Sequence, residues 1–192
     1  MTTNVLITGV GGQGTVLASR LIAAAAMRRG YDVRTAETIG MAQRGGGVVS
    51  HTRIGGNIHS PLIPMGRAHA MIALEPAEAY RNIGFLSPGG TLIVCDVPVM
   101  PAGAASYDAG AVIDYLRETV SKTTVIDGRP LMEISPKTLN VAMLGAAAEC
   151  GVFPFRKETL LTIISEMPRF KDENLRAFTE GGKAYAAYIG KY

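Results

Sequence analysis

The chain has 192 residues, of which 47% are hydrophobic and 18% charged, so it can form a sizeable core and is not intrinsically disordered. Its net charge of +3 is too small for a typical nucleic-acid-binding protein, and its two cysteines exclude a disulfide scaffold and a complete four-cysteine iron–sulfur site. No apolar run reaches the roughly 18 residues that a membrane span needs. Because the N-terminus also lacks a signal-peptide pattern, we expect a cytoplasmic protein that binds neither nucleic acid nor a membrane.

The chain begins with the pattern of a βαβ unit. Residues 5–8 form a short apolar run, which predicts a buried strand. Residues 14–29 predict a helix, because apolar residues recur on one stripe and two arginines suit its C-terminal end. Residues 31–37 predict a second strand. This order predicts a right-handed βαβ unit in a parallel sheet, which is a Rossmann-like start.

Further strands and helices follow in alternation. Residues 48–54 predict a strand, and Gly55-Gly56 could turn it back as a short hairpin. A turn is expected over residues 87–90. The remaining strands are expected over residues 69–74, 91–95 and 124–126, and the remaining helices over residues 75–85, 111–120, 137–149, 156–167 and 170–188.

These elements predict an α/β fold of three layers, in which a central mixed, mostly parallel sheet carries helices on both faces. The whole chain, residues 1–192, is expected to form one domain. Residues 150–192 would be its helical C-terminal segment, which either folds over the sheet or reaches towards a partner.

The first glycine cluster follows the first predicted strand and opens the first predicted helix. Its residues are Gly9, Gly11, Gly12, Gln13 and Gly14, in the pattern G-x-G-x-x-G. Such glycines permit a tight turn, a close approach of a diphosphate to the backbone, and close packing of helix on strand. The same pattern also fits a tight turn that binds nothing. Both interpretations stay open, and these five residues are candidates for cofactor binding.

A carboxylate in the second predicted strand favours a dinucleotide as the cofactor. Glu37 stands 23 positions after Gly14, where a carboxylate could bind the ribose of a dinucleotide. The alternative function is therefore an NAD(P)-dependent oxidoreductase. It suffers from the lack of a recognisable substrate domain after the βαβ unit.

The second glycine cluster contains three consecutive glycines before the strand predicted at residues 48–54. Arg44, Gly45 and Gly46 are candidates for ligand binding, because an arginine beside bare backbone could hold a carboxylate or a phosphate. The competing interpretation is a flexible surface loop. Three contiguous glycines cost enough conformational entropy to favour a binding or interface role.

No catalytic residue and no metal ligand is predicted. The three histidines are not spaced as metal ligands, and no nucleophile motif or Walker lysine is present. Cys95 and Cys150 are expected to be buried small hydrophobic residues.

Taken together, the two glycine clusters resemble a known family. The segments GVGGQGT (residues 9–15), AETIGMAQRGGGVVSHTRIG (residues 36–55) and the stretch over residues 60–94 resemble the small subunit of 2-oxoacid:ferredoxin oxidoreductases. Within that family, Gln43 to Gly46 is most similar to the beta subunit of the indolepyruvate enzymes. A gamma subunit of a pyruvate or 2-oxoglutarate enzyme is the alternative.

The resemblance implies a subunit that is inactive by itself. The large (alpha) subunit would carry thiamine diphosphate, Mg²⁺ and [4Fe–4S] clusters, and the complex would convert an aryl-2-oxoacid to an acyl-CoA with electrons passing to ferredoxin. This chain would pack on the large subunit, could contact CoA, and could form a homodimer when isolated. Residues 1–90 hold eight arginines, no lysine and four acidic residues, a balance that suits an acidic partner surface or the CoA phosphates.

Overall fold

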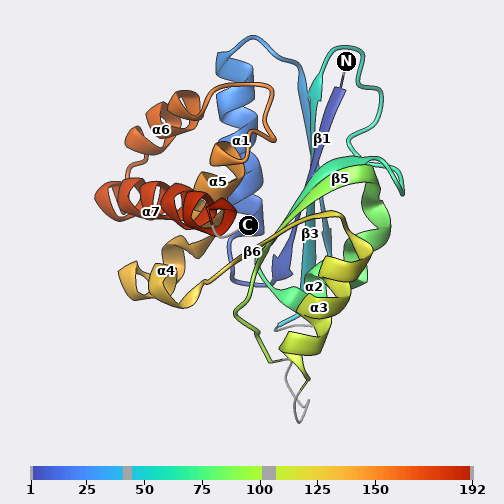
Figure 1. The fold of residues 1–192 in the computed structure, drawn as a ribbon. Coiled ribbons are helices and arrows are strands. Elements are labelled where there is room, and N and C mark those ends of the chain that lie inside the picture. Colours follow the sequence, from blue (N-terminus) through green and yellow to red (C-terminus); the bar gives the residue numbers. More distant parts are fainter. Residues whose placement is uncertain (1, 41–44, 101–106, 191–192) are drawn as a thin grey trace.

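The computed structural model describes residues 2–40, 45–100 and 107–190. Its six strands form one sheet (Figure 1). The strands are β1 (Thr2–Val10), β2 (Val33–Ile39), β3 (Gly47–Gly55), β4 (Ala68–Ala73), β5 (Leu86–Cys95) and β6 (Lys122–Ile126). The α-helices are α1 (Thr15–Arg28), α2 (Pro76–Asn82), α3 (Ala109–Thr119), α4 (Arg129–Ile134), α5 (Leu139–Glu149), α6 (Lys157–Ser165) and α7 (Lys171–Ile189), and short 3₁₀ turns cover Ile83–Phe85 and Pro136–Thr138.

The sheet is mixed, with the strand order β2-β3-β1-β4-β5-β6. The strands β1, β4, β5 and β6 run parallel to one another, whereas β3 is antiparallel to both β1 and β2. The predicted mixed, mostly parallel sheet is therefore confirmed. The units β4-α2-β5 and β5-α3-β6 supply its parallel crossovers.

The start of the chain differs from the predicted βαβ unit in one respect. The strands β1 and β2 point in the same direction, but β3 lies between them and pairs with both. The chain turns back directly after β2, where the Gly40 N–H donates to the Gly47 carbonyl at 2.9 Å, so the hairpin precedes β3. The hairpin expected at Gly55-Gly56 is wrong, because no strand follows before β4.

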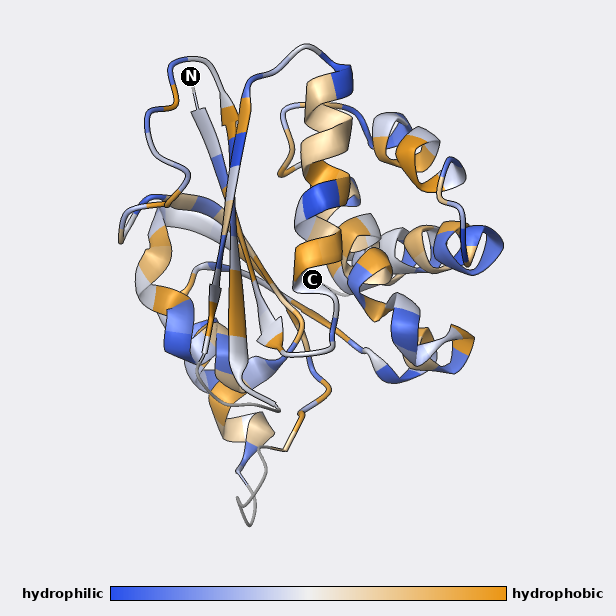
Figure 2. Ribbon diagram, turned by 180° about the vertical axis from the view of Figure 1, so that it is seen from behind, coloured by the Kyte–Doolittle hydropathy of each residue, from blue (hydrophilic) through white to orange (hydrophobic). Residues whose placement is uncertain are grey.

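Two helical layers enclose the sheet. In Figure 1 the helices α1, α4, α5, α6 and α7 lie on one face, while α2 and α3 lie on the other. The side chains of each strand alternate between two hydrophobic clusters, so that Val5 and Ile7 face the first layer and Leu6 faces the second. Figure 2 shows hydrophobic residues concentrated on the central strands, with hydrophilic residues on the outer turns of the helices. The three-layer fold is confirmed.

The C-terminal helices pack on the same layer as α1. Leu160 and Ile164 of α6 and Phe178 of α7 are buried in one cluster with α1 and α5. Arg28 at the end of α1 forms a bidentate pair with Glu166, at 2.7 and 2.9 Å. Of the two interpretations for residues 150–192, the segment therefore folds back over the helices on the sheet. None of the described helices has the length and hydropathy of a membrane span.

Candidate functional site

The candidate site lies at the edge of the sheet where the parallel strands end. The neighbours β1 and β4 are followed by helices on opposite faces, α1 and α2. In open α/β sheets such a point of divergence leaves a crevice beyond the carboxyl ends of the two strands. The turn over residues 9–14 lies at this crevice, next to Leu74, which directly follows β4.

The side chain of Gln13 fills the space between these two strand ends. Its Oε1 accepts from the Val10 N–H at 2.7 Å, and its Nε2 donates to the Leu74 carbonyl at 3.1 Å. The Gln13 N–H donates to the Val10 carbonyl at 3.0 Å, which closes the turn. A Cβ on Gly9 would come within 2.8 Å of Gln13 Oε1 and 3.2 Å of the Leu74 Cβ. Gly9 therefore makes room for the glutamine that ties β1 to β4.

The two glycine clusters meet at this edge, although 30 residues of sequence lie between their nearest members, Gly14 and Gly45. The Gly11 N–H donates to the Gly46 carbonyl at 2.9 Å. A Cβ on Gly11 would lie 3.5 Å from that carbonyl oxygen, so the two backbones run close together. Gly12 and Gly45 are exposed, and each has a positive φ, +97° and +69°. Arg44 lies outside the described residues.

Helix α5 reaches the first glycine turn through Asn140. The Asn140 side chain is 2% exposed, and its Nδ2 donates to the Gly14 carbonyl at 3.0 Å. Gly14 has φ +83°, and a Cβ there would come within 2.5 Å of Asn140 Nδ2. The glycine is thus required both by the backbone conformation and by the close approach of the asparagine.

Two buried carboxylates stand behind the turns, on the face that carries α2. Glu75 caps α2, accepting from the Glu78 N–H at 2.8 Å, and the hydroxyl of Tyr107 donates to its other oxygen. Glu78 pairs with Arg81 and lies where a Cβ on Gly47 would come within 2.5 Å. Burial, followed by the hydrogen bond to Glu75, raises the pKa of Tyr107. Both carboxylates are therefore occupied in structural contacts.

Asn140, Glu75 and Glu78 were not predicted as site residues. Asn140 is a buried polar residue in a helix whose following eight residues are apolar or glycine, and such a residue needs a hydrogen-bond partner. The spacing of Glu75 and Glu78 is that of a helix cap and its first turn. These signals indicate a buried contact, but they do not identify the partner.

The position of Glu37 argues against a dinucleotide site at the first glycine turn. Glu37 lies in β2 opposite Ser50, is exposed, and is separated from β1 by the whole of β3. Two strand spacings, about 10 Å, stand between its strand and the turn. In addition, the N–H groups of Val10 and Gly11 are already bonded within the protein. This geometry does not resemble a ribose and diphosphate site.

The described residues contain no group of three or more His, Cys, Asp or Glu residues that could hold a metal ion. The two cysteines lie apart, Cys95 at the end of β5 and Cys150 after α5. Burial raises the pKa of the Cys95 thiol to about 12, so it is protonated and unreactive at neutral pH. The residues present do not fit an iron–sulfur cluster.

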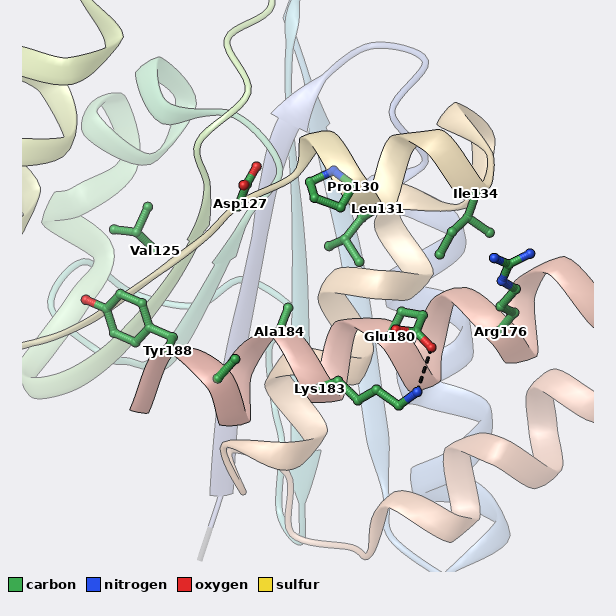
Figure 3. Close-up of a pocket in the computed structure, with 11 residues that line it drawn as sticks. Val125, Asp127, Pro130, Leu131, Ile134, Arg176, Glu180, Lys183, Ala184 and Tyr188 are labelled. Atoms are coloured by element: carbon green, nitrogen blue, oxygen red, sulfur yellow. Dashed lines mark hydrogen bonds and ion pairs between the residues drawn. The ribbon is translucent and has the colours of Figure 1, made fainter. Parts of the chain in front are cut away.

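A separate groove of about 460 Å³ lies between β6, α4 and α7 (Figure 3). Leu131 and Ile134 from α4 and Ala184 from α7 form its apolar walls. Glu180 and Lys183 pair with each other at its rim, at 2.8 Å. None of the residues predicted for cofactor binding lines this groove.

Comparison with known proteins identifies a family that this chain matches. Residues 4–184 match the profile of the family described as pyruvate ferredoxin/flavodoxin oxidoreductase. A protein of Archaeoglobus fulgidus named "indolepyruvate oxidoreductase subunit IorB" is 40% identical to this chain, over 94% of each chain.

Two solved structures share the fold. Subunit PORC of the pyruvate oxidoreductase of Thermotoga maritima has a TM-score of 0.70 at 22% identity, covering 95% of this chain and 96% of that one. The 2-oxoglutarate:ferredoxin oxidoreductase of Magnetococcus marinus, solved with 2-oxoglutarate, coenzyme A and succinyl-CoA bound, has a TM-score of 0.69 at 22% identity. It covers 97% of this chain, which corresponds to 31% of the longer chain.

Proposed function

The chain belongs to the pyruvate ferredoxin/flavodoxin oxidoreductase family as the small subunit of a 2-oxoacid:ferredoxin oxidoreductase, and we propose that its complex oxidises an aryl-2-oxoacid such as indolepyruvate. The 40% identity to an indolepyruvate oxidoreductase subunit over nearly the whole chain supports this substrate class. In the proposed reaction, the bond between the carboxyl and carbonyl carbons breaks and CO₂ leaves. Two electrons pass to ferredoxin, and the acyl group joins the sulfur of CoA as the thiol proton is released.

One structural observation carries the proposed role of this chain. The two glycine clusters are joined by the hydrogen bond from Gly11 to Gly46. The first cluster is fixed in place by the hydrogen bonds from Gln13 to Leu74 and from Asn140 to Gly14. The result is a surface of bare backbone at the edge of the sheet, with Gly12 and Gly45 exposed. Such a surface lets another backbone or a ligand approach closely, because no Cβ stands in the way. The described residues of this surface offer no nucleophile and no acid–base pair.

We therefore assign the redox chemistry to a large subunit. Thiamine diphosphate, Mg²⁺ and [4Fe–4S] clusters would be held there and would supply the carbanion chemistry and the path for electrons. The small subunit would cover the active site of the large one with the joined glycine turns. Covering such a site excludes water and positions the substrate.

Reconstitution with the large subunit tests this role. We expect the isolated chain to show no reduction of ferredoxin or of a viologen dye with arylpyruvates, and the large subunit alone to show little. Mixing the two should restore the activity, with arylpyruvates preferred over pyruvate and 2-oxoglutarate in kcat/KM. Activity of the large subunit that is unchanged when this chain is left out would contradict the proposal.

We further propose that CoA contacts the exposed backbone of the glycine turns and the side chain of Arg44. A guanidinium that binds a phosphate contributes about 1.5 kcal/mol or more, which corresponds to roughly tenfold in affinity. In the reconstituted complex, Arg44→Ala should raise the KM for CoA about tenfold while kcat changes little. Arg156→Ala, which removes an arginine preceding α6, serves as the control. Equal KM values for the two variants would place CoA elsewhere.

A further inference from the structure

The two edges of the sheet differ in how they are covered. At the β6 edge, α7 packs alongside the strand (Figure 3). The Tyr188 hydroxyl donates to the Thr123 carbonyl at 3.2 Å. At the other edge, no described strand pairs with the outer side of β2. Five of the seven residues of β2 are exposed.

The outward main-chain groups of β2 can be identified from its pairing with β3. Hydrogen bonds flank the strand at Gly40 with Gly47 and at Asp32 with Gly55, both at 2.9 Å. Because bonding alternates along an antiparallel strand, even-numbered residues bond to β3 and odd-numbered residues point outwards. The free edge of β2 therefore consists of the N–H and C=O groups of Val33, Thr35, Glu37 and Ile39.

Natural proteins protect such an edge with proline, lysine, a bulge or a covering segment. The seven residues of β2 contain neither proline nor lysine, their two charged residues Arg34 and Glu37 have opposite signs, and their pairing with β3 runs without a register shift. An edge of this length that no described strand pairs with is suited to adding another strand. A strand from a second molecule is therefore the expected cover.

The side chains of β2 are complementary to a second copy of the same strand. Ile39 is 67% exposed at one end. At the other end, Met27, Tyr31 and Val33 line a hollow of about 590 Å³ together with polar residues. If two β2 strands pair antiparallel with Ala36 on the two-fold axis, Ile39 of each copy lies opposite Val33 of the other. The exposed isoleucine then enters the hollow of its partner.

Shifting this register by two residues in either direction is less favourable. One shift places Val33 opposite Glu37, and the other places Glu37 opposite its own copy, where like charges destabilise the pair. The register centred on Ala36 instead places Thr35 opposite Glu37 and Thr38 opposite Arg34. It also brings the smallest side chain of the strand to the axis, where the two copies approach most closely.

We propose that the free edge of β2 pairs antiparallel with the same edge of a second copy of this chain, with Ala36 on the two-fold axis. The two six-stranded sheets then form one continuous sheet. The proposed pairing uses main-chain groups of residues 33–39 and none of the residues predicted for cofactor binding. It is therefore independent of the proposed catalytic role.

A cysteine placed on the axis tests the register. In the full chain carrying Cys150→Ser, Ala36→Cys faces its own copy in a pair whose Cα atoms lie about 4.5 Å apart, which suits a disulfide. We expect mild oxidation to give a covalent dimer. The matched variant Thr38→Cys should not cross-link, because its two copies stand about 13 Å apart along the strand. Equal cross-linking of the two variants, or none of Ala36→Cys, would overturn the proposal.

A second variant tests the edge without a cross-link. Thr35→Pro removes an outward N–H and leaves the hydrogen bonds to β3 in place, so the circular dichroism spectrum should be retained. Sedimentation should show a dimer for the wild-type chain and for Thr35→Ala, and a monomer for Thr35→Pro. A monomeric wild-type chain, or a dimeric Thr35→Pro, would refute the proposal. A Thr35→Pro variant that instead loses binding to the large subunit would assign the edge to that partner.

Discussion

Replacing Gly181 by alanine is expected to lower the free energy of unfolding by about 3 kcal/mol or more. A Cβ at this position would lie 1.8 Å from the Ala142 carbonyl oxygen, and one on Gly145 would lie 1.9 Å from the Phe178 carbonyl oxygen. The helices α5 and α7 thus cross backbone to backbone, and each glycine touches the main chain of the other helix. Main-chain atoms cannot rotate away, so the helices would have to separate.

The neighbouring glycine provides the matched control. A Cβ on Gly182 meets nothing closer than 3.7 Å, which is ordinary contact. Gly182→Ala should therefore be neutral or stabilise the helix by about 0.5–1 kcal/mol, because alanine favours a helix over glycine. Urea unfolding followed by far-ultraviolet circular dichroism measures both variants. Equal stabilities for Gly181→Ala and Gly182→Ala would show that the close crossing is absent.

The second large effect is expected at Gly14. Alanine at φ +83° costs about 1–2 kcal/mol, and its Cβ would displace the Asn140 amide from the Gly14 carbonyl. Loss of that hydrogen bond leaves the buried asparagine unsatisfied, at a further cost of about 1–3 kcal/mol. Gly14→Ala should therefore destabilise the chain by roughly 3 kcal/mol.

A substitution at Gly12 distinguishes the backbone cost of alanine at positive φ from the cost of losing the Asn140 hydrogen bond. It has φ +97°, but no atom lies within 4 Å of its Cβ position, so Gly12→Ala should show only the backbone cost. A double-mutant cycle of Gly14→Ala with Asn140→Ala isolates the contact. We expect the double variant to be less destabilised than the sum of the single variants. Additive effects would mean that Asn140 and Gly14 do not interact.

The local patterns of the sequence predicted most elements of the fold. Alternating apolar runs and helical stripes located β1, α1 and the helices after residue 137 to within a few residues. The short helix α4 was not predicted, and the turn expected at residues 87–90 is part of β5. Periodicity could not reveal that β3 inserts between β1 and β2, because strand order depends on contacts between distant residues.

The candidate site was predictable in its parts and not in its assembly. Both glycine clusters were identified from composition. Ordering several glycines costs conformational entropy, so such a cluster indicates a close approach or an unusual backbone conformation. Their meeting through Gly11 and Gly46, and the supporting roles of Asn140 and Glu78, depend on the tertiary structure. The ligand-binding roles of the glycines and of Arg44 stay predictions.

The position of α5 bears on how the protein is synthesised. Nine of the eleven residues of α5 are buried, and α7 covers one side of it across the glycine crossing. Because α7 follows α5 in the chain, α5 lacks that cover until α7 has been synthesised, and its apolar surface is exposed until then. This part of the core can therefore close only once both helices have left the ribosome and met at the glycine crossing.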